Sequence, residues 1–172
     1  MNINKHYNIA VLISGSGSNL QAIIDSIKTG TISNATIKIV ISNKKNAYGL
    51  ERAKQNGIES ICISPKMYET SKAYDQKVLE ILKKKDIDLV VLAGYLRILT
   101  PILLNAYQDR ILNIHPSLLP SFGGDKMYGM KVHQAAIERG VKYSGCTVHV
   151  VTEEVDAGPI IDQEIVKVEK FD

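Results

Sequence analysis

The stretch Asn113-Ile114-His115-Pro116 places an amide and an imidazole two residues apart at the expected end of a β-strand. Residues i and i+2 of a strand face the same side, so Asn113 and His115 can reach one substrate atom together. An acyl transfer needs such a pair, because its tetrahedral intermediate builds negative charge on one oxygen and its leaving group must be protonated. The pair therefore predicts a catalytic centre, although a lone histidine before proline more often only ends a strand.

Length and composition indicate one domain, residues 1–172, large enough to bury a core without disulfides or metals. The net charge of +3 is mild, and no basic tract with interleaved aromatic residues points to nucleic acid. Cys62 and Cys146 lie in apolar, strand-like surroundings without a CxxC or His/Cys cluster, so we expect buried thiols and no metal site. We find no signal peptide and no apolar run that could cross a bilayer, which favours a cytoplasmic protein without membrane partners.

Strand-like and helix-like segments alternate along the chain. Residues 8–13 form a continuous apolar run, as in strands buried on both faces of a parallel sheet, and residues 19–28 follow with apolar side chains at helical spacing. The other expected strands are residues 36–41, 60–63, 88–93, 110–115, 143–151 and 160–168, and the other expected helices are residues 49–56, 71–85, a short one after Thr100-Pro101, and 131–139. The pattern predicts an α/β fold: a doubly wound, mostly parallel sheet of about seven strands with helices on both faces.

Ligands of such a sheet bind beyond the carboxyl ends of its strands, where the turn Ser14-Gly15-Ser16-Gly17-Ser18-Asn19 is expected. Small residues let backbone amides approach a phosphate, and the start of a helix adds partial positive charge. Leu20 stands where a dinucleotide fingerprint has its third glycine, and no Gly-Lys-Ser/Thr ending follows. The turn therefore favours a monophosphate; the alternative is an ordinary capped turn between a strand and a helix.

Two further loops follow expected strands. Residues 93–99 contain a glycine and apolar side chains that could line a pocket for a flat ring, and Arg97 could serve there or pair structurally with a carboxylate. Residues 152–159 bring several carboxylates, for which a solvated acidic turn is the default. One acid could instead pair with His115 and relay a proton, and we choose Asp156 because the Ala-Gly-Pro after it forms a rigid turn.

These motifs together resemble the folate-dependent formyltransferases, and within them the phosphoribosylglycinamide formyltransferases, or GAR transformylases, of purine biosynthesis. The resemblance keeps the order of the motifs over nearly the whole chain. The segments that show it are Ile13–Ile23, Ser42–Lys44, Gly49–Ala53, Leu92–Leu99, Asn113–Pro120 and Asp156–Ile161. The resemblance implies a formyltransferase-like, Rossmann-related fold and transfer of the formyl group of 10-formyltetrahydrofolate to the amine of glycinamide ribonucleotide.

The resemblance also implies the roles of individual residues. Asn113 would bind the formyl oxygen, protonated His115 would stabilise the oxyanion and assist the leaving nitrogen, and Asp156 would pair with His115 and help to move the amine proton. The ribonucleotide phosphate would lie at Gly17, Ser18 and Asn19. The folate would contact Leu96, Arg97, Ile98, Leu99, Asn113, Thr152, Glu153, Glu154, Val155 and Asp156. No metal is implied, the implied partners are the two small-molecule substrates, and the protein would be a monomer or a homodimer.

Two departures from the family bear on these expectations. Relatives generally continue beyond the point where this chain stops, at Lys170-Phe171-Asp172, and their further residues contact the ribonucleotide, so we expect weakened acceptor binding. Ser71 stands where many relatives carry an arginine that contacts the donor, so we expect no donor contact there. The alternatives are a different folate-dependent formyltransferase, a formyltetrahydrofolate hydrolase, and a non-catalytic module that binds folate or phosphate.

Overall fold

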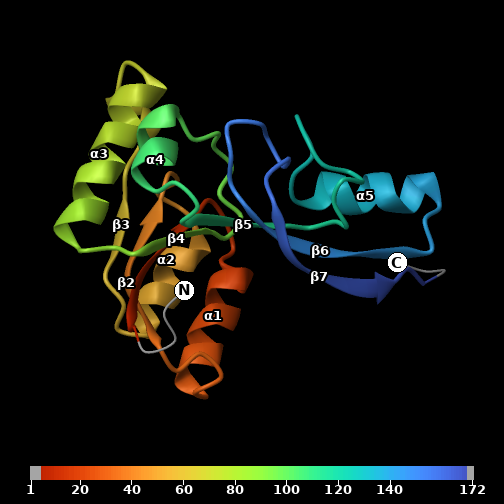
Figure 1. Ribbon diagram of the computed structural model, residues 1–172, viewed down its shortest axis with the longest axis horizontal. Helices are drawn as coiled ribbons and strands as arrows, with labels where there is room; N and C mark the ends of the chain where they lie inside the picture. Colours follow the sequence, from red (N-terminus) through yellow and green to blue (C-terminus); the bar gives the residue numbers. More distant parts are fainter. Residues whose placement is uncertain (1–4, 170–172) are drawn as a thin grey trace. The chain divides into compact units, whose positions relative to one another are not determined.

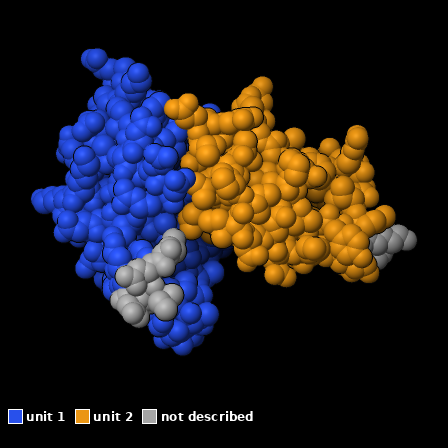
Figure 2. Space-filling model, viewed as in Figure 1, with its two compact units in different colours: residues 1–111 blue, residues 112–172 orange. Residues whose placement is uncertain are grey.

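The computed structural model describes residues 5–169, so Lys170–Asp172, on which the expectation of a missing tail rests, lie outside the described residues. The strands within this range form one seven-stranded sheet in the order β3-β2-β1-β4-β5-β6-β7 (Figure 1). The chain divides into two compact units, residues 1–111 and 112–172 (Figure 2). The predicted mostly parallel α/β sheet is confirmed.

Four parallel strands form the frame of the first unit. They are β1 (Tyr7–Ile13), β2 (Ala35–Ser42), β3 (Ser60–Cys62) and β4 (Leu89–Leu92). β1 is central, because it pairs with β2 on one side and with β4 on the other. Its segment Ala10–Ile13 is fully buried, which is why the sequence there is a continuous apolar run without polar alternation.

The α-helices of the first unit associate in two pairs. They are α1 (Ser18–Lys28), α2 (Tyr48–Gln55), α3 (Ser71–Lys84) and α4 (Pro101–Ala106), and the 3-10 helix η1 (Pro65–Met67) precedes α3. α1 packs with α2, and α3 packs with α4 (Figure 1). The strand order runs outward from β1 to β3 and then returns to β4 on the other side of β1. Since parallel crossovers are right-handed, this reversal puts the two helix pairs on opposite faces.

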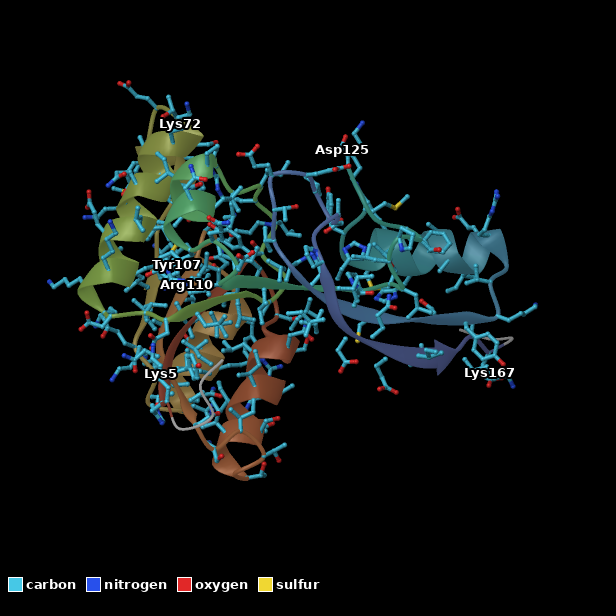
Figure 3. The ribbon with its side chains drawn as sticks, viewed as in Figure 1. Lys5, Lys72, Tyr107, Arg110, Asp125 and Lys167 are labelled. Carbon is cyan, nitrogen blue, oxygen red and sulfur yellow. The ribbon has the colours of Figure 1, made fainter. Side chains whose placement is uncertain are left out.

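Two details fix the connection from α3 through α4 to β5 (Ile111–His115). Thr100 stands at the N-cap position of α4, but its side chain makes no capping hydrogen bond. Its backbone N–H instead donates to Oδ2 of the buried Asp75 at 2.6 Å. After α4, the guanidinium of Arg110 lies 5.0 Å from the ring centroid of Tyr107 and donates to the carbonyl of Ala106 (Figure 3).

The second unit is antiparallel. β5 pairs with β6 (Tyr143–Val150), β6 pairs with β7 (Ile160–Lys167), and α5 (Met130–Arg139) lies between β5 and β6 in the sequence. In this register Asn113 stands opposite His149, and His115 stands opposite Thr147. Residues directly opposite in an antiparallel pair share one face of the sheet. The pairing therefore collects polar side chains of both strands on one side.

The expectation of buried cysteines is wrong. Cys62 is exposed and Cys146 is partly exposed, and both are free thiols. Cys62 ends β3, which has only three residues and forms an edge of the sheet, so little of the protein covers it. Among the helices in residues 5–169, none is long and apolar enough to cross a membrane.

Gly17 gives a testable consequence of this fold. It has φ +71°, and a Cβ there would lie 2.6 Å from Cα of Gly49, whereas a Cβ at Gly15 would meet nothing within 4 Å. We expect Gly17→Ala to lower the free energy of unfolding by about 2 kcal/mol or more, and Gly15→Ala to change it by less than about 0.5 kcal/mol. Urea unfolding of both variants measures this, and equal losses would contradict the packing of the turn against α2.

Candidate active site

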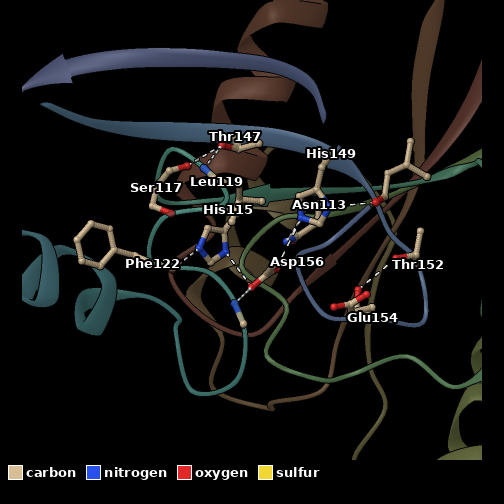
Figure 4. A network of polar contacts seen from close by, with 12 residues as sticks. Asn113, His115, Ser117, Leu119, Phe122, Thr147, His149, Thr152, Glu154 and Asp156 are labelled. Atoms are coloured by element: carbon tan, nitrogen blue, oxygen red, sulfur yellow. Dashed lines mark hydrogen bonds and ion pairs between the residues drawn. The ribbon is translucent and has the colours of Figure 1, made fainter. Parts of the chain in front are cut away.

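A series of four polar side chains in contact lies where β5 and β6 pair (Figure 4). Asn113 Nδ2 is 3.1 Å from Nε2 of His149, and that nitrogen is 3.6 Å from Oδ1 of Asp156. The other carboxylate oxygen, Oδ2, is 3.4 Å from Nδ1 of His115. His115 and His149 are buried, and the Asp156 side chain is 10% exposed. All three residues predicted to be catalytic are therefore neighbours, and His149 joins them.

The hydrogen bonds of His115 determine where its protons lie. Nε2 is 2.9 Å from the carbonyl oxygen of Phe122, which can only accept, so Nε2 carries a proton and donates it. Nδ1 faces Asp156. An unprotonated Nδ1 would point its lone pair at the carboxylate oxygen, and the two would repel each other. The contact is therefore attractive when Nδ1 is also protonated. The geometry thus suits an imidazolium held between a carbonyl and a carboxylate.

His149 is the functional candidate that the sequence reasoning missed. Its Nδ1 donates to the carbonyl oxygen of Val150 at 3.0 Å, which leaves Nε2 to face both Asn113 and Asp156. The signal was the alternation of Thr147 and His149 with apolar residues in one strand. The contact of His149 with the predicted centre follows from the register of β6 against β5, which the sequence alone does not give.

The backbone holds Asp156 in a fixed orientation. Asp156 has φ +55°, a left-handed conformation that aspartate tolerates better than most residues. Gly158 follows where a Cβ would lie 1.8 Å from the carbonyl oxygen of Val150, so the turn passes too close to β6 for any side chain. The N–H of Gly124 donates to Oδ2 of Asp156 at 3.0 Å. The backbone of the protein itself therefore orients Asp156.

The pKa of Asp156 results from opposing effects. Burial raises it most strongly, while the contact with His149, the hydrogen bond from the Gly124 amide and the charge of His115 lower it, and the lowering effects together prevail. The pKa of Asp156 is therefore below its ordinary value of 3.8. Asp156 is an anion at neutral pH, in position to balance a positive charge on either imidazole.

Thr147 fixes the loop that follows His115. Its hydroxyl donates to the carbonyl of Ser117 at 2.7 Å and accepts from the N–H of Leu119 at 3.0 Å. Gln163 of β7 donates from Nε2 to the same hydroxyl oxygen and to the carbonyl of Leu119. Thr147 is fully buried, so these bonds are shielded from water. The loop is thus tied to both β6 and β7.

The predicted phosphate turn starts α1. Gly17 is the N-cap residue in the left-handed conformation, and no side chain caps the helix. Ser18 is exposed and Asn19 is half-buried. The turn is supported from α2, because Arg52 Nε donates to the carbonyl of Ser16 at 2.9 Å and Gly49 donates to the carbonyl of Gly15. Binding of phosphate at Gly17, Ser18 and Asn19 stays a prediction.

The predicted folate segment after β4 presents apolar side chains to solvent. Leu96 is 46% exposed and Ile98 is 68% exposed, whereas Leu99 is buried. The guanidinium of Arg97 lies 4.4 Å from the ring centroid of Tyr74 and donates to Oγ of Ser71 at 3.4 Å. Arg97 is therefore fixed by an aromatic ring and a hydroxyl, and no ion pair with a carboxylate is found for it within residues 5–169.

The acidic loop after β6 contributes one carboxylate to the site. The side chain of Thr152 donates to the carbonyl of Glu154, and both residues are exposed, as are Glu153 and Val155. Only Asp156 joins the histidines. In the part of the chain that the structure describes, no group of three or more His, Cys, Asp or Glu side chains is arranged to hold a metal ion. Folate contacts of Thr152–Val155 stay a prediction.

The lowered pKa of Asp156 makes a testable contribution to stability. A carboxyl whose folded pKa lies below its unfolded pKa stabilises the fold above the unfolded value, here about 3.8, and loses that contribution as pH falls through the folded value. The difference in unfolding free energy between wild type and Asp156→Asn should therefore be largest above pH 4 and shrink below it. Urea unfolding from pH 2 to pH 7 measures it, with Asp125→Asn as the control; a difference that grows in acid would contradict the assignment.

Comparison with known proteins confirms the family that the motifs suggest. The formyl transferase family matches residues 7–172. The chain is 47% identical to phosphoribosylglycinamide formyltransferase of Escherichia coli over 161 residues, which are 94% of this chain and 73% of that protein. It is also 47% identical to the human trifunctional purine biosynthetic protein adenosine-3 over 168 residues, 98% of this chain and 16% of that protein.

Solved structures are also similar to this chain in fold. The crystal structure of glycinamide ribonucleotide transformylase 1 from Symbiobacterium toebii matches with a TM-score of 0.91 at 45% identity, covering 99% of this chain and 79% of that one. Phosphoribosylglycinamide formyltransferase from Bacillus halodurans matches with a TM-score of 0.88 at 44% identity, covering 96% and 82%. The sequence motifs, the fold and these likenesses together show that the chain belongs to the formyl transferase family.

Proposed function

We propose that this chain is a phosphoribosylglycinamide formyltransferase, which transfers the formyl group of 10-formyltetrahydrofolate to the primary amine of glycinamide ribonucleotide. The observation that supports this most is the series of contacts that links Asn113, His149, Asp156 and His115, in a chain 47% identical to the Escherichia coli enzyme of that name. These side chains offer the donors and the charge that a formyl transfer needs.

The first step is attack of the acceptor amine on the formyl carbon. A nitrogen–carbon bond forms and the formyl oxygen takes negative charge, for which Asn113 supplies an uncharged N–H and His115 a charged one. In the structure His115 donates a hydrogen bond from Nε2 to the carbonyl oxygen of Phe122. A substrate oxygen can accept this hydrogen bond when it takes the place of the carbonyl.

The second step breaks the bond between the formyl carbon and the folate nitrogen. That nitrogen must gain a proton, while the attacking amine must lose one. Asp156, an anion between two imidazoles, keeps a proton on His115 available for the leaving nitrogen and offers a nearby acceptor for the amine proton. The products are N-formylglycinamide ribonucleotide and tetrahydrofolate, so atoms and charge balance without a redox partner.

The acceptor's phosphate would bind at the start of α1. Gly17 in its left-handed conformation and the uncapped N–H groups of Ser18 and Asn19 support this assignment, because such a helix start attracts anions. The pterin ring would contact the segment Leu96–Leu99, whose exposed apolar side chains suit a flat ring. The folate would also contact the loop Thr152–Asp156.

Turnover tests the proposed function. The chain should release tetrahydrofolate from 10-formyltetrahydrofolate only when glycinamide ribonucleotide is present, and the ribonucleotide should gain the mass of one formyl group. Release without the acceptor would instead indicate a hydrolase. Binding of both ligands without turnover would indicate a non-catalytic module.

Replacement of the oxyanion donors gives a sharper prediction. Because Asn113 and His115 act on charge that develops in the transition state, Asn113→Ala and His115→Ala should each lower kcat by about 10² or more and change donor affinity little. Asn105→Ala, an exposed asparagine in α4, is the matched control. Steady-state kinetics and calorimetry provide both values, and an unchanged kcat in Asn113→Ala would remove that residue from the mechanism.

A further inference from the structure

We propose that Ser14, in the turn assigned to the ribonucleotide, is a positioning residue for the other substrate: its hydroxyl holds the segment Leu96–Leu99 in the shape that receives the folate. The inference rests on the proposed function, which assigns that segment to the donor. No charge, metal or substrate atom needs to touch Ser14. Its effect passes through the backbone of the neighbouring loop.

Ser14 holds this loop at two points. Its backbone N–H donates to the carbonyl of Gly94 at 3.1 Å, and its Oγ accepts the N–H of Leu96 at 2.8 Å. The same hydroxyl donates its single proton to Oδ1 of Asn43 at 2.6 Å. Since that proton is directed at Asn43, the lone pairs of the hydroxyl are left for Leu96. Ser14 is 3% exposed, so water does not compete for these bonds.

The strand order explains why a residue of one loop can fix another. β1 and β4 are parallel neighbours, and the direction of the strand order reverses between them. Ser14 follows the last residue of β1, and Gly94 and Leu96 follow β4, so both loops leave the same edge of the sheet side by side. Ligands of doubly wound sheets bind at this point of reversal.

Loss of the hydroxyl should weaken donor binding selectively. Without it the N–H of Leu96 has no partner, and the loop must be ordered at the expense of binding free energy. We expect Ser14→Ala to raise the Kd of a folate analogue about tenfold. The Kd of glycinamide ribonucleotide should change less than about twofold, because Gly17, Ser18 and Asn19 do not depend on this hydroxyl.

Two other variants separate this role from general stability. Ser42→Ala is the matched control, since Ser42 is equally buried and its hydroxyl also bridges backbone groups, the N–H and carbonyl of Lys44, but it makes no contact with the donor segment. Asn43→Ala removes the acceptor of the Ser14 proton and leaves the hydroxyl itself. It should raise the donor Kd less than Ser14→Ala does, and it provides a second test if Ser14→Ala does not fold.

The experiment is calorimetry of each variant with two ligands, a 10-deaza folate analogue that cannot give up a formyl group and glycinamide ribonucleotide, together with steady-state kinetics. We expect a raised donor Kd and donor KM with little change in kcat for Ser14→Ala, and wild-type values for Ser42→Ala. An unchanged donor Kd in Ser14→Ala, or equal losses for both ligands, would overturn the inference. If the wild-type chain did not bind the folate analogue, the proposed function would itself fail, and this inference with it.

Discussion

A carboxylate removed from water remains an anion only when nearby donors and positive charges replace its hydration, and Asp156 meets this condition through its contacts with two histidines and a backbone amide. His115 and His149 face its two oxygens, and the amide of Gly124 donates to one of them. The antiparallel pairing of β5 with β6 brings the two histidines together, and the close passage of Gly158 along β6 fixes the turn. The strand pairing and the turn of the second unit thus supply the contacts that this one charge requires.

The first unit is organised by a different constraint, the reversal of strand order at β1 and β4. Right-handed crossovers place the helices on opposite faces and leave two loops adjacent at the reversal. One loop presents the start of a helix, which suits an anion, and the other presents exposed apolar side chains, which suit a ring. Ser14 joins these loops, because its hydroxyl accepts the N–H of Leu96 and its backbone N–H donates to the carbonyl of Gly94.

Local signals in the sequence were sufficient for most of the fold. Apolar runs, helical stripes and glycines predicted every strand and helix longer than three residues to within a few positions, and the spacing of Asn113 and His115 predicted a shared face. Contacts that depend on register were not predictable. His149 and Thr147 became neighbours of the site only through pairing across strands.

The sequence also could not predict the exposure of a residue at the edge of the sheet or the contact partner of a long side chain. Cys62 was expected to be buried because its neighbours are apolar, but an edge strand of three residues leaves it exposed. Arg97 was expected either to serve in a ligand pocket or to pair with a carboxylate. In the structure its guanidinium contacts the face of Tyr74. Both outcomes depend on tertiary packing around the residue, which neighbouring sequence does not encode.

We propose that His115 and Asp156 act as one unit in formyl transfer, and a double-mutant cycle tests this most directly. The values of kcat/KM are measured for wild type, His115→Ala, Asp156→Asn and the double variant. If the carboxylate acts through the imidazole, removing Asp156 has no further effect on the rate once His115 is absent. The double variant should then be no slower than the slower single variant. Losses that multiply in the double variant would show that the two residues act independently and would contradict the account.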